Sequence, residues 1–363
     1  MIDDRMVKCK LFDFSRGVIM SEGSNGKIKV TKKRKALKII LSVLVVIILL
    51  SGGVFGYGWY QLSKINKTSI SKDDGDLGIS KETIKNIETK DSDEEIVNVA
   101  FFGLDRRDPK EPCRSDSIMI LSVDKKHKKI KMNSIMRDTY VKIKDHGETK
   151  LNHAYAYGGP ELAIRTLNEN FEMNIREFVA VDFYKLENII DALGGVDIDV
   201  RADEVKLINS YMKEVANIEH KKVTDVSGTG KQTLNGMQAV AYSRIRYTAG
   251  GEFERTERQR TVLTALFNKV KSGGVAGFSA NVTKLLPYVE TSMDSMDIVK
   301  LGTSAFTSGT TNFEQERFPL DGYCKGQMID GVWYLITDLK ATIEQLHKYI
   351  YEDIKPVPGE PLF

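Results

Sequence analysis

The chain has 363 residues, of which 41% are hydrophobic and 28% are charged. This composition is ordinary for a globular protein and excludes a chain that is disordered throughout. The formal net charge of +3 is too small to indicate nucleic-acid binding, so any argument from charge must rest on its distribution along the chain.

The first distinctive segment is an uncharged run at residues 39–63, which follows a basic segment at residues 27–35. The run begins almost entirely with Ile, Leu and Val and ends with tyrosines and a tryptophan. A membrane span needs about 20 apolar residues, and aromatic residues gather at membrane interfaces. Because basic residues stay inside, we predict a single-pass cell-membrane protein with residues 1–38 as a basic cytoplasmic tail and an extracytoplasmic remainder.

A cleaved signal peptide is the alternative to a membrane anchor. Signal peptides have apolar cores of about 7–15 residues and a cleavage site with small residues. The uncharged run at residues 39–63 is longer and ends in bulky aromatic residues, which favours the anchor.

Residues 64–95 are rich in Lys, Asp, Ser and Gly. This composition predicts an extracytoplasmic linker, with a short helix at residues 81–89. We expect the folded domain to occupy residues 96–355 and a C-terminal tail to occupy residues 356–363.

Strand-like and helical patterns alternate beyond the linker. Strands are predicted at residues 96–104, 117–123, 129–135, 178–183, 196–200 and 313–319, and helices at residues 161–170, 185–193, 203–217, 236–242, 255–271 and 338–351. Such alternation predicts an α/β fold, a single layered α/β/α domain with a central mixed sheet.

Arginine is concentrated in one segment of a chain that otherwise prefers lysine. Residues 244–260 contain no lysine, and their arginines are Arg244, Arg246, Arg255, Arg258 and Arg260. A guanidinium group is a planar fork of donors that binds phosphate oxygens in pairs. The cluster therefore indicates an anionic, phosphate-like ligand.

The alternative is a surface helix laced with salt bridges, because glutamates lie among these arginines and Glu254 precedes Arg258 by one helical turn. The helical spacing favours the ligand, since Arg255, Arg258, Val262 and Leu266 share one stripe with an apolar continuation. A solvated helix would direct its arginines away from that stripe.

A second set of polar residues lies at predicted strand ends. Asp105 follows the first strand, Arg114 and Asp116 lie at the start of the next, and Arg137 follows the third. Loops at strand ends commonly carry the functional sites of α/β folds. Two carboxylates beside arginines suit Mg²⁺ shared with phosphates, although surface Asp–Arg pairs are a second interpretation.

The three cysteines, Cys9, Cys113 and Cys324, fit no zinc or CxxC spacing. The predicted topology places Cys113 and Cys324 on the oxidising side of the membrane. A disulfide between them and two free thiols are both compatible with the sequence.

Taken together, the ordered motifs of residues 96–271 resemble the LytR–CpsA–Psr family of cell-wall glycopolymer ligases. In chain order they are Gly-Leu-Asp-Arg-Arg at 103–107, Arg-Ser-Asp-Ser-Ile at 114–118, Ser-Ile-Met-Arg-Asp-Thr-Tyr at 134–140, Leu-Asn-His-Ala-Tyr-Ala-Tyr-Gly-Gly at 151–159, Asp-Ala-Leu-Gly-Gly-Val-Asp at 191–197, Leu-Asn-Gly-Met-Gln-Ala at 234–239, Tyr-Ser-Arg-Ile-Arg at 242–246 and Arg-Thr-Glu-Arg-Gln at 255–259. Each motif is weak alone, but the ordered set is specific.

The resemblance implies a Mg²⁺-dependent phosphotransferase at the extracytoplasmic surface of the cell membrane. Such an enzyme moves a glycopolymer from an undecaprenyl-pyrophosphate carrier to peptidoglycan, with no role for nucleic acid. Wall teichoic acid, capsule and other polymers all remain open as the substrate. A non-catalytic polyprenyl-phosphate-binding regulator and a polyprenyl-pyrophosphate pyrophosphatase are the alternatives on the same fold.

The resemblance also implies roles for individual residues. Asp105 and Asp116 would hold Mg²⁺. The pyrophosphate would contact Arg114, Arg137, Arg244, Arg246, Arg255 and Gln259, and the catalytic set would be Arg137, Arg244, Arg246 and Glu252. An apolar cavity between sheet and helices would take the prenyl chain.

The chain departs from the family pattern at two of these positions. Met136 stands where the family commonly has proline, which we expect to reduce the rigidity of that loop. Glu252 stands where the family commonly has aspartate. If that acid is a base or orients an arginine, its extra methylene would shift the carboxylate, and small displacements matter to chemistry.

Overall fold

The computed structural model describes residues 65–91, 94–106, 112–219, 222–246, 248, 251–310 and 312–360. The predicted tail and membrane span at residues 1–63 lie outside this set. Among the helices of the described residues, none is long and apolar enough to cross a membrane.

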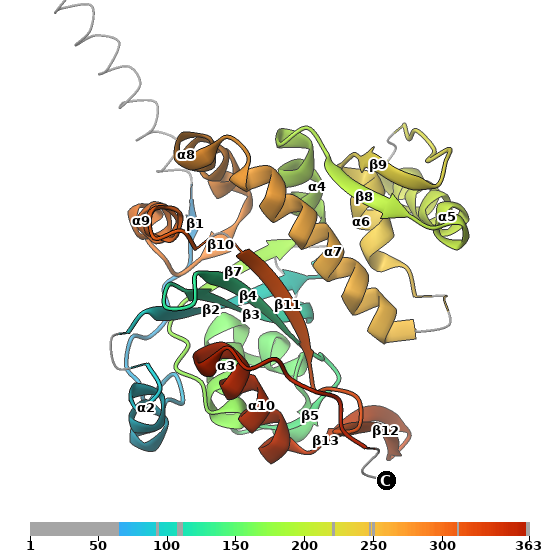
Figure 1. The fold of residues 1–363 in the computed structure, drawn as a ribbon. Helices are drawn as coiled ribbons and strands as arrows, with labels where there is room; N and C mark the ends of the chain where they lie inside the picture. Colours follow the sequence, from blue (N-terminus) through green and yellow to red (C-terminus); the bar gives the residue numbers. More distant parts are fainter. Residues whose placement is uncertain are drawn as a thin grey trace, which may run out of the picture. The chain divides into compact units, whose positions relative to one another are not determined.

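A seven-stranded sheet forms the centre of the fold (Figure 1). Its strands, in spatial order, are β1 (Asn66–Lys67), β10 (Glu290–Thr291), β7 (Phe178–Asp182), β2 (Ile96–Leu104), β3 (Ser115–Asp124), β4 (Lys129–Ile135) and β11 (Asn312–Phe318). Strand β3 is antiparallel to β2 and β4, whereas β7 is parallel to β2 and β11 is parallel to β4. The predicted central mixed sheet is therefore confirmed.

This strand order brings four carboxyl ends to one edge of the sheet. Strands β2, β7, β4 and β11 all run in the same direction, so each ends at that edge. Ligand sites in α/β folds lie outside the carboxyl ends of strands. The edge receives Asp105 after β2, Arg137 after β4 and Phe183 after β7.

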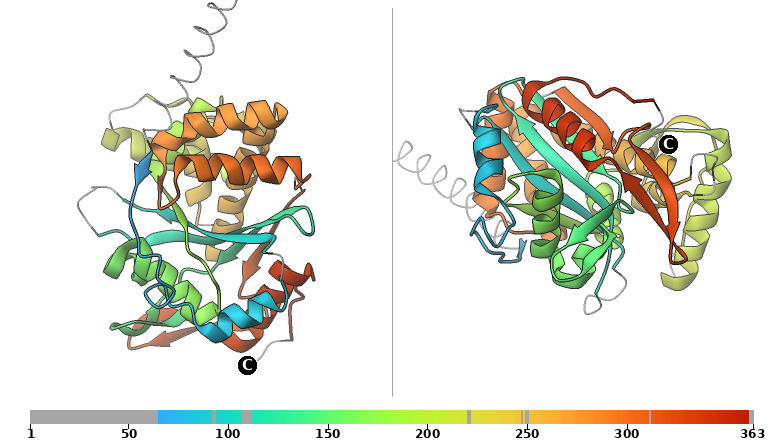
Figure 2. Two further views of the ribbon diagram at one scale, coloured as in Figure 1. Left: turned by 90° about the vertical axis from the view of Figure 1, so that its left-hand side faces the viewer. Right: turned by 90° about the horizontal axis from the view of Figure 1, so that it is seen from below.

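Helices cover both faces of the sheet (Figures 1 and 2). Helices α3 (His153–Phe171) and α10 (Leu339–Glu352) pack on one face, and α7 (Gly251–Lys271) crosses the other. Side chains from both strands and helices form the main core, as Phe102, Ile120, Leu167 and Ile350 illustrate. Burial of this apolar surface is the principal stabilising contribution.

A second apolar cluster joins α7 to neighbouring helices and a small hairpin. The elements involved are α4 (Phe183–Ala192), α5 (Ala202–Glu219), α6 (Gly236–Arg244), β8 (Val196–Val200) and β9 (Gly230–Leu234). Ile190, Ile198, Ile208 and Val262 are buried in this cluster. Helix α7 contacts both this cluster and the sheet. Side chains near its start, those of Glu252 and Arg255, contact residues at the polar sheet edge.

The predicted helices of the second half agree closely with α5, α6, α7 and α10. Helix α3 differs, because it starts well before the predicted residue 161. Gly158 and Gly159 have non-helical backbone angles, so α3 consists of two helical pieces joined by a kink before Pro160. The periodic pattern detected only the second piece.

The predicted linker at residues 64–95 is instead partly built into the domain. Its short helix is confirmed as α2 (Lys81–Glu88), which Ser80 caps by accepting from the Thr83 amide. Leu77 and Ile87 are buried in the main core. The apolar residues are few and widely spaced, so composition alone resembled a linker.

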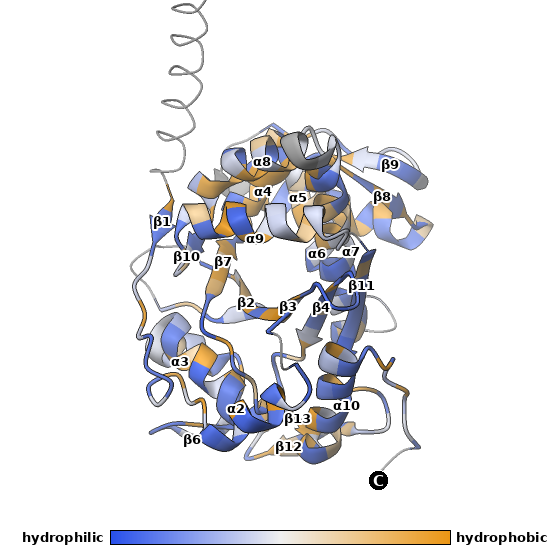
Figure 3. Ribbon diagram, turned by 60° about the vertical axis from the view of Figure 1, so that its left-hand side comes forward, coloured by the Kyte–Doolittle hydropathy of each residue, from blue (hydrophilic) through white to orange (hydrophobic). Residues whose placement is uncertain are grey.

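Several elements were not predicted. They are the strands β1, β9 and β10, the helices α8 (Gly274–Leu285) and α9 (Ser295–Thr307), and two hairpins. One hairpin is formed by β5 (Tyr140–Ile143) with β6 (Gly147–Lys150), and the other by β12 (Cys324–Ile329) with β13 (Val332–Thr337). In Figure 3 their colouring mixes hydrophilic and hydrophobic residues. Of the two states left open for Cys113 and Cys324, the structure has free thiols.

Candidate active site

Asp116 occupies a β-bulge at the sheet edge. Gly103 pairs with Ser117 and Leu104 pairs with Ser115, so Asp116 is the extra residue of β3. Bulges re-aim a side chain and are frequent beside active sites. Gly103 permits the close approach, because a Cβ there would lie 2.8 Å from the Cβ of Ser117.

Three arginines converge on the Asp116 carboxylate. Arg137 donates to its Oδ1, and Arg246 Nη2 and Arg255 Nη1 each lie 3.6 Å from its Oδ2. Arg255 Nη2 also lies 3.4 Å from the Asp116 carbonyl oxygen. These arginines come from the β4 loop, the end of α6 and the first turns of α7, so the fold assembles residues that are distant in sequence.

Glu252 contacts the same three arginines. Its Oε1 lies 3.4 Å from Arg137 Nη2 and 3.5 Å from Arg246 Nε, and its Oε2 lies 2.8 Å from Arg255 Nη2. Of the two roles considered for this acid, the geometry favours orientation of arginines. We call Asp116, Arg137, Arg246, Glu252 and Arg255 the arginine cluster.

The cluster carries three positive charges against two negative ones. Burial lowers the pKa of Arg255, and Arg137 lowers it further by repulsion, while Glu252 and Asp116 oppose the change. For Arg137, burial also lowers the pKa, but the attraction of Asp116 and Glu252 outweighs it and the pKa is raised. Arginine stays protonated in proteins, so the cluster has a surplus positive charge.

Among the described residues, the buried Nε atom of Arg255 has no hydrogen-bond partner. An unsatisfied buried donor is unfavourable unless another group, water or a ligand completes it. Together with the surplus charge, this donor suits an anion with several oxygen atoms.

Arg244 and Asp105 lie together in a pocket beside the arginine cluster, which Phe183 also lines. The guanidinium carbon of Arg244 is 5.5 Å from the centroid of the Phe183 ring, within cation–π range. Arg114 is exposed at the same edge. Burial lowers the pKa of His153, and the charge of Arg114 lowers it further.

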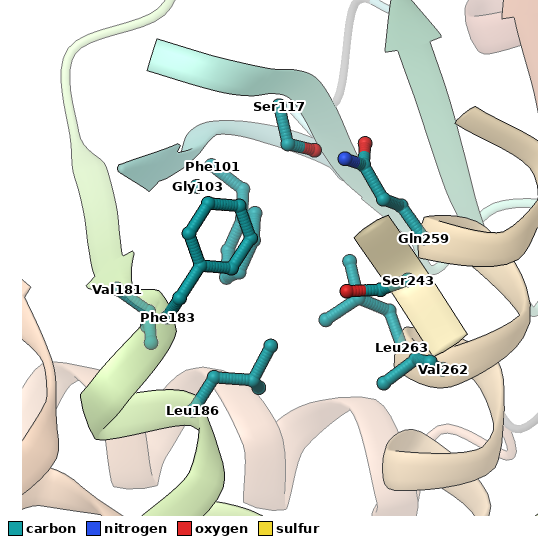
Figure 4. A pocket seen from close by; sticks show the side chains of 10 residues that line it. All are labelled: Phe101, Gly103, Ser117, Val181, Phe183, Leu186, Ser243, Gln259, Val262 and Leu263. Carbon is teal, nitrogen blue, oxygen red and sulfur yellow. The ribbon is translucent and has the colours of Figure 1, made fainter. Parts of the chain in front are cut away.

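An apolar cavity lies between the sheet and the helices α4, α6 and α7 (Figure 4). The space that a water-sized sphere can occupy in it is about 30 Å³, and the empty space is about 400 Å³ when the open mouth is included. Phe101, Val181, Phe183, Leu186, Val262 and Leu263 form most of its wall. Ser117 and Gln259 lie together at one end (Figure 4). Ser117 Oγ and Gln259 Nε2 are buried, and neither has a hydrogen-bond partner in the part of the chain that the structure describes. Because Ser117 follows Asp116, the polar end of the cavity adjoins the arginine cluster.

The predicted metal ligands belong to different side-chain sets. Asp116 lies in the arginine cluster and Asp105 in the pocket of Arg244. Within the described part of the chain, no three His, Cys, Asp or Glu side chains are grouped as metal ligands. Magnesium commonly uses one or two carboxylates and completes its shell with phosphate and water. Asp105 and Asp116 lie at the paired ends of β2 and β3 and supply one carboxylate each, a set that Mg²⁺ shared with phosphate can use.

Two of the arginines in residues 244–260 lie outside both the arginine cluster and the Arg244 pocket. Arg258 pairs with the buried Glu204 at 2.8 Å and with Glu254 at 2.7 Å, so the alternative of a salt-bridged helix holds for this residue. Burial lowers the pKa of Arg260, and the charge of Arg317 lowers it further.

Three neighbours of the site were not predicted. Phe183 separates the cavity from the Arg244 pocket, and its position directly after a strand at the carboxyl edge was an available signal. Asp138 lies 3.4 Å from Arg137 Nε and 2.7 Å from Lys150 Nζ. The pairing with Lys150 depends on a hairpin that the sequence pattern did not reveal.

Residues 59–349 match the LytR_cpsA_psr family model. The chain belongs to the LytR–CpsA–Psr family. Its resemblance by motifs is thereby confirmed.

Members of the LytR–CpsA–Psr family with assigned names are similar along most of their length. The polyisoprenyl-teichoic acid–peptidoglycan teichoic acid transferase TagT of Bacillus subtilis (strain 168) is 31% identical over 257 residues, covering 70% of this chain and 76% of TagT. The transferase TagU of Bacillus mycoides (strain KBAB4) is 30% identical over 307 residues, covering 83% of this chain and 92% of TagU.

Solved structures of the LytR–CpsA–Psr family share this fold. A structure described as TagT bound to LI-WTA has a TM-score of 0.56 at 28% identity, covering 72% of this chain and 91% of that one. Another, described as YwtF (TagT) with bound octaprenyl pyrophosphate lipid, has a TM-score of 0.52 at 27% identity, covering 71% and 91%.

Proposed function

We propose that the protein is a phosphotransferase that moves a glycopolymer from an undecaprenyl-pyrophosphate carrier to peptidoglycan. One observation carries the proposal: an arginine cluster with surplus positive charge adjoins the polar end of an apolar cavity. A polyprenyl pyrophosphate has the same arrangement, an anionic diphosphate joined to an apolar chain. Related family members are named as transferases of teichoic acid to peptidoglycan, and one related structure holds a prenyl pyrophosphate.

In the proposed reaction, a hydroxyl oxygen of peptidoglycan attacks the phosphorus that carries the glycopolymer. The bond from that phosphorus to the bridging oxygen breaks, and prenyl monophosphate leaves with that oxygen. The hydroxyl proton passes to a carboxylate of the site. A phosphodiester therefore joins polymer to acceptor.

The chain's own residues bind and orient the reacting groups. Arg137, Arg246 and Arg255 stabilise the negative charge that develops on the phosphates, and Glu252 holds their forks in place. Phosphoryl transfer depends mainly on positioning and charge stabilisation of this kind. Arg244 and the exposed Arg114 would contact the outer phosphate oxygens.

Asp105 and Asp116 would hold Mg²⁺, which when bound neutralises phosphate charge. We also propose that residues 39–63 anchor the protein in the cell membrane, with the catalytic domain outside. A prenyl-linked donor stays in the bilayer, so the site must act at its surface.

The test uses the full chain in detergent with Mg²⁺, a prenyl-pyrophosphate glycopolymer and peptidoglycan oligomers. The expected products are prenyl monophosphate and a glycan–peptidoglycan adduct, and Asp105→Ala and Arg244→Ala should abolish both. Unchanged turnover in these variants would reject the assigned site. Prenyl phosphate without an adduct would favour the pyrophosphatase, and donor binding without cleavage would favour the regulator.

A further inference from the structure

The β12–β13 hairpin exposes an unusual amount of apolar surface. Met328 is 60% exposed, Val332 41% and Trp333 38%, although the hairpin lies outside the seven-stranded sheet. Met328 and Trp333 are directly paired across the two strands, so their side chains share one face. Exposed apolar groups gathered in this way mark interaction sites more often than isolated ones do.

A glycine shapes the position of the Trp333 indole. A Cβ on Gly326 would lie 2.7 Å from Trp333 Nε1, so the absence of a side chain lets the ring lie against the strand. Tyr140 and Tyr334 add a T-shaped pair with ring centroids 4.9 Å apart. Tyr334 follows Trp333 in β13, so the two side chains leave opposite faces of the strand, and Lys150 lies beside both rings. We call Tyr140, Met328, Trp333 and Tyr334 the aromatic surface.

Backbone pairing ties this hairpin to the site. The Leu335 amide donates to the Asp138 carbonyl oxygen at 2.9 Å, and Thr139 forms a parallel bridge with Leu335. Asp138 directly follows Arg137, a member of the arginine cluster. Figure 1 shows β12 and β13 at the same lower side of the molecule as the start of α7.

Lys150 provides a second link between the aromatic surface and the site. Its ammonium group lies 2.7 Å from Asp138 Oδ1 and 5.9 Å from the ring centroids of both Trp333 and Tyr334. Asp138 in turn lies 3.4 Å from Arg137 Nε. Asp138 and Lys150 thus connect Arg137 of the arginine cluster to the rings of Trp333 and Tyr334.

We infer that the aromatic surface binds the acceptor glycan chain of the proposed transfer, an inference that rests on the proposed function. The apolar cavity proposed for the donor meets the arginine cluster at Ser117 and Gln259. The hairpin meets the cluster at another point, because it is hydrogen-bonded to Asp138, the residue after Arg137. The acceptor therefore has its own approach to the reacting phosphorus. A pyranose ring presents a face of C–H groups that packs on an aromatic face, while its hydroxyls stay in water.

A direct binding test uses tryptophan fluorescence. The chain has two tryptophans, Trp59 and Trp333, so Trp59→Phe leaves Trp333 as the reporter in the full chain. An oligomer of alternating N-acetylglucosamine and N-acetylmuramic acid should change its emission saturably, and poly-glutamate should not. No response to the oligomer, or an equal response to poly-glutamate, would overturn the inference, the latter in favour of an anionic peptide ligand.

A kinetic test separates this role from a structural one. In the transfer assay, Trp333→Ala should raise the acceptor KM about 2- to 10-fold relative to the donor KM. Trp333→Phe, which keeps a ring, should restore most of it. Val357→Ala, an exposed apolar residue beyond α10, is the matched control and should leave both KM values unchanged.

An unchanged acceptor KM in Trp333→Ala would refute the aromatic surface while leaving the transferase intact. If the wild type forms no adduct at all, the proposed function fails instead. The fluorescence titration then still decides whether the surface binds glycan.

Discussion

At the scale of single residues, Arg246 is the member of the arginine cluster best placed to follow a moving phosphate. Its side chain is 46% exposed, and its contacts with Asp116 and Glu252 are long, at 3.6 and 3.5 Å. Arg255, by contrast, is buried and held at 2.8 Å by Glu252. One arginine is therefore adaptable and the other is fixed.

We expect Arg246→Ala to lower kcat/KM for the donor about 10²- to 10³-fold, the usual loss when one charge-stabilising donor is removed. Arg246→Lys should recover little, because an ammonium group cannot bind two oxygens as a fork. Arg176→Ala, which removes an exposed pair with Asp74, is the control. Activity within threefold of wild type in Arg246→Ala would contradict the assignment.

Met136 illustrates a departure from the family pattern that the structure reinterprets. Its amide donates to the Phe318 carbonyl oxygen at 2.9 Å, and its sulfur accepts from Thr256 Oγ1 at 3.8 Å. Proline could not donate this hydrogen bond. The expected loss of loop rigidity is thus offset by a bond to β11.

Met136→Pro should accordingly lower the free energy of unfolding by about 0.5–1.5 kcal/mol relative to Met136→Leu, which keeps the amide donor. Urea denaturation of the two variants measures this difference. A proline variant as stable as the leucine variant would show that the bond contributes nothing net.

At the scale of elements, α7 serves two purposes along one face. Arg255 reaches the site, whereas Arg258, one turn later, pairs with buried Glu204 and donates to the Ile245 carbonyl oxygen at 3.2 Å. That second contact fixes the segment that carries Arg246. Periodicity placed both arginines on an inward stripe but could not distinguish ligand binding from structure.

Removing Arg258 should be strongly destabilising, because the buried Glu204 then keeps only Arg201, whose half-exposed guanidinium lies at the longer distance of 3.4 Å. We expect Arg258→Ala to lose about 3–5 kcal/mol of unfolding free energy. The double variant Arg258→Met with Glu204→Leu should recover most of this loss, since neither charge remains. Equal losses in the single and double variants, measured by urea denaturation, would contradict this explanation.

Glu254 gives the start of α7 an acid-sensitive contact. A hydrogen bond from Thr248 lowers its pKa to about 2 from the ordinary 4.5, against the effect of burial and with help from Arg258 and Arg201. Because the folded pKa is the lower one, the stabilisation is complete above about pH 4.5 and is lost as the pH falls toward 2.

The Glu254→Gln variant should therefore be less stable than wild type at pH 7, and the difference should shrink toward pH 2.5. Urea denaturation at the two pH values measures it. Asp73→Asn, at an exposed carboxylate of a turn, is the control. A difference that stays constant with pH would mean that the Glu254 charge is not responsible.

At the scale of the whole molecule, strand order explains which polar residues the sequence could place together and which it could not. The antiparallel pairing of β2 and β3 made it foreseeable that Asp105 and Asp116 lie at the same end of the sheet. The bulge that turns Asp116 toward the arginines was not foreseeable, because it depends on a pairing shift. Likewise, burial of Leu77 depends on contacts distant in sequence, such as those with α3.

In the proposed reaction, the donor and the acceptor would have separate routes to one edge of the sheet. The apolar cavity reaches the arginine cluster from between the helices, and the hairpin reaches it through Asp138. On the proposed function, two such routes would lead to transfer between two bound substrates and not to release to water.

The most direct test of that claim is the transfer reaction run in ¹⁸O-labelled water by the full chain. Attack by a sugar hydroxyl predicts a glycan–peptidoglycan phosphodiester without ¹⁸O in its phosphate, as measured by mass spectrometry. Glycan phosphomonoester carrying ¹⁸O, with no adduct, would show that water is the acceptor and would contradict the proposed transferase.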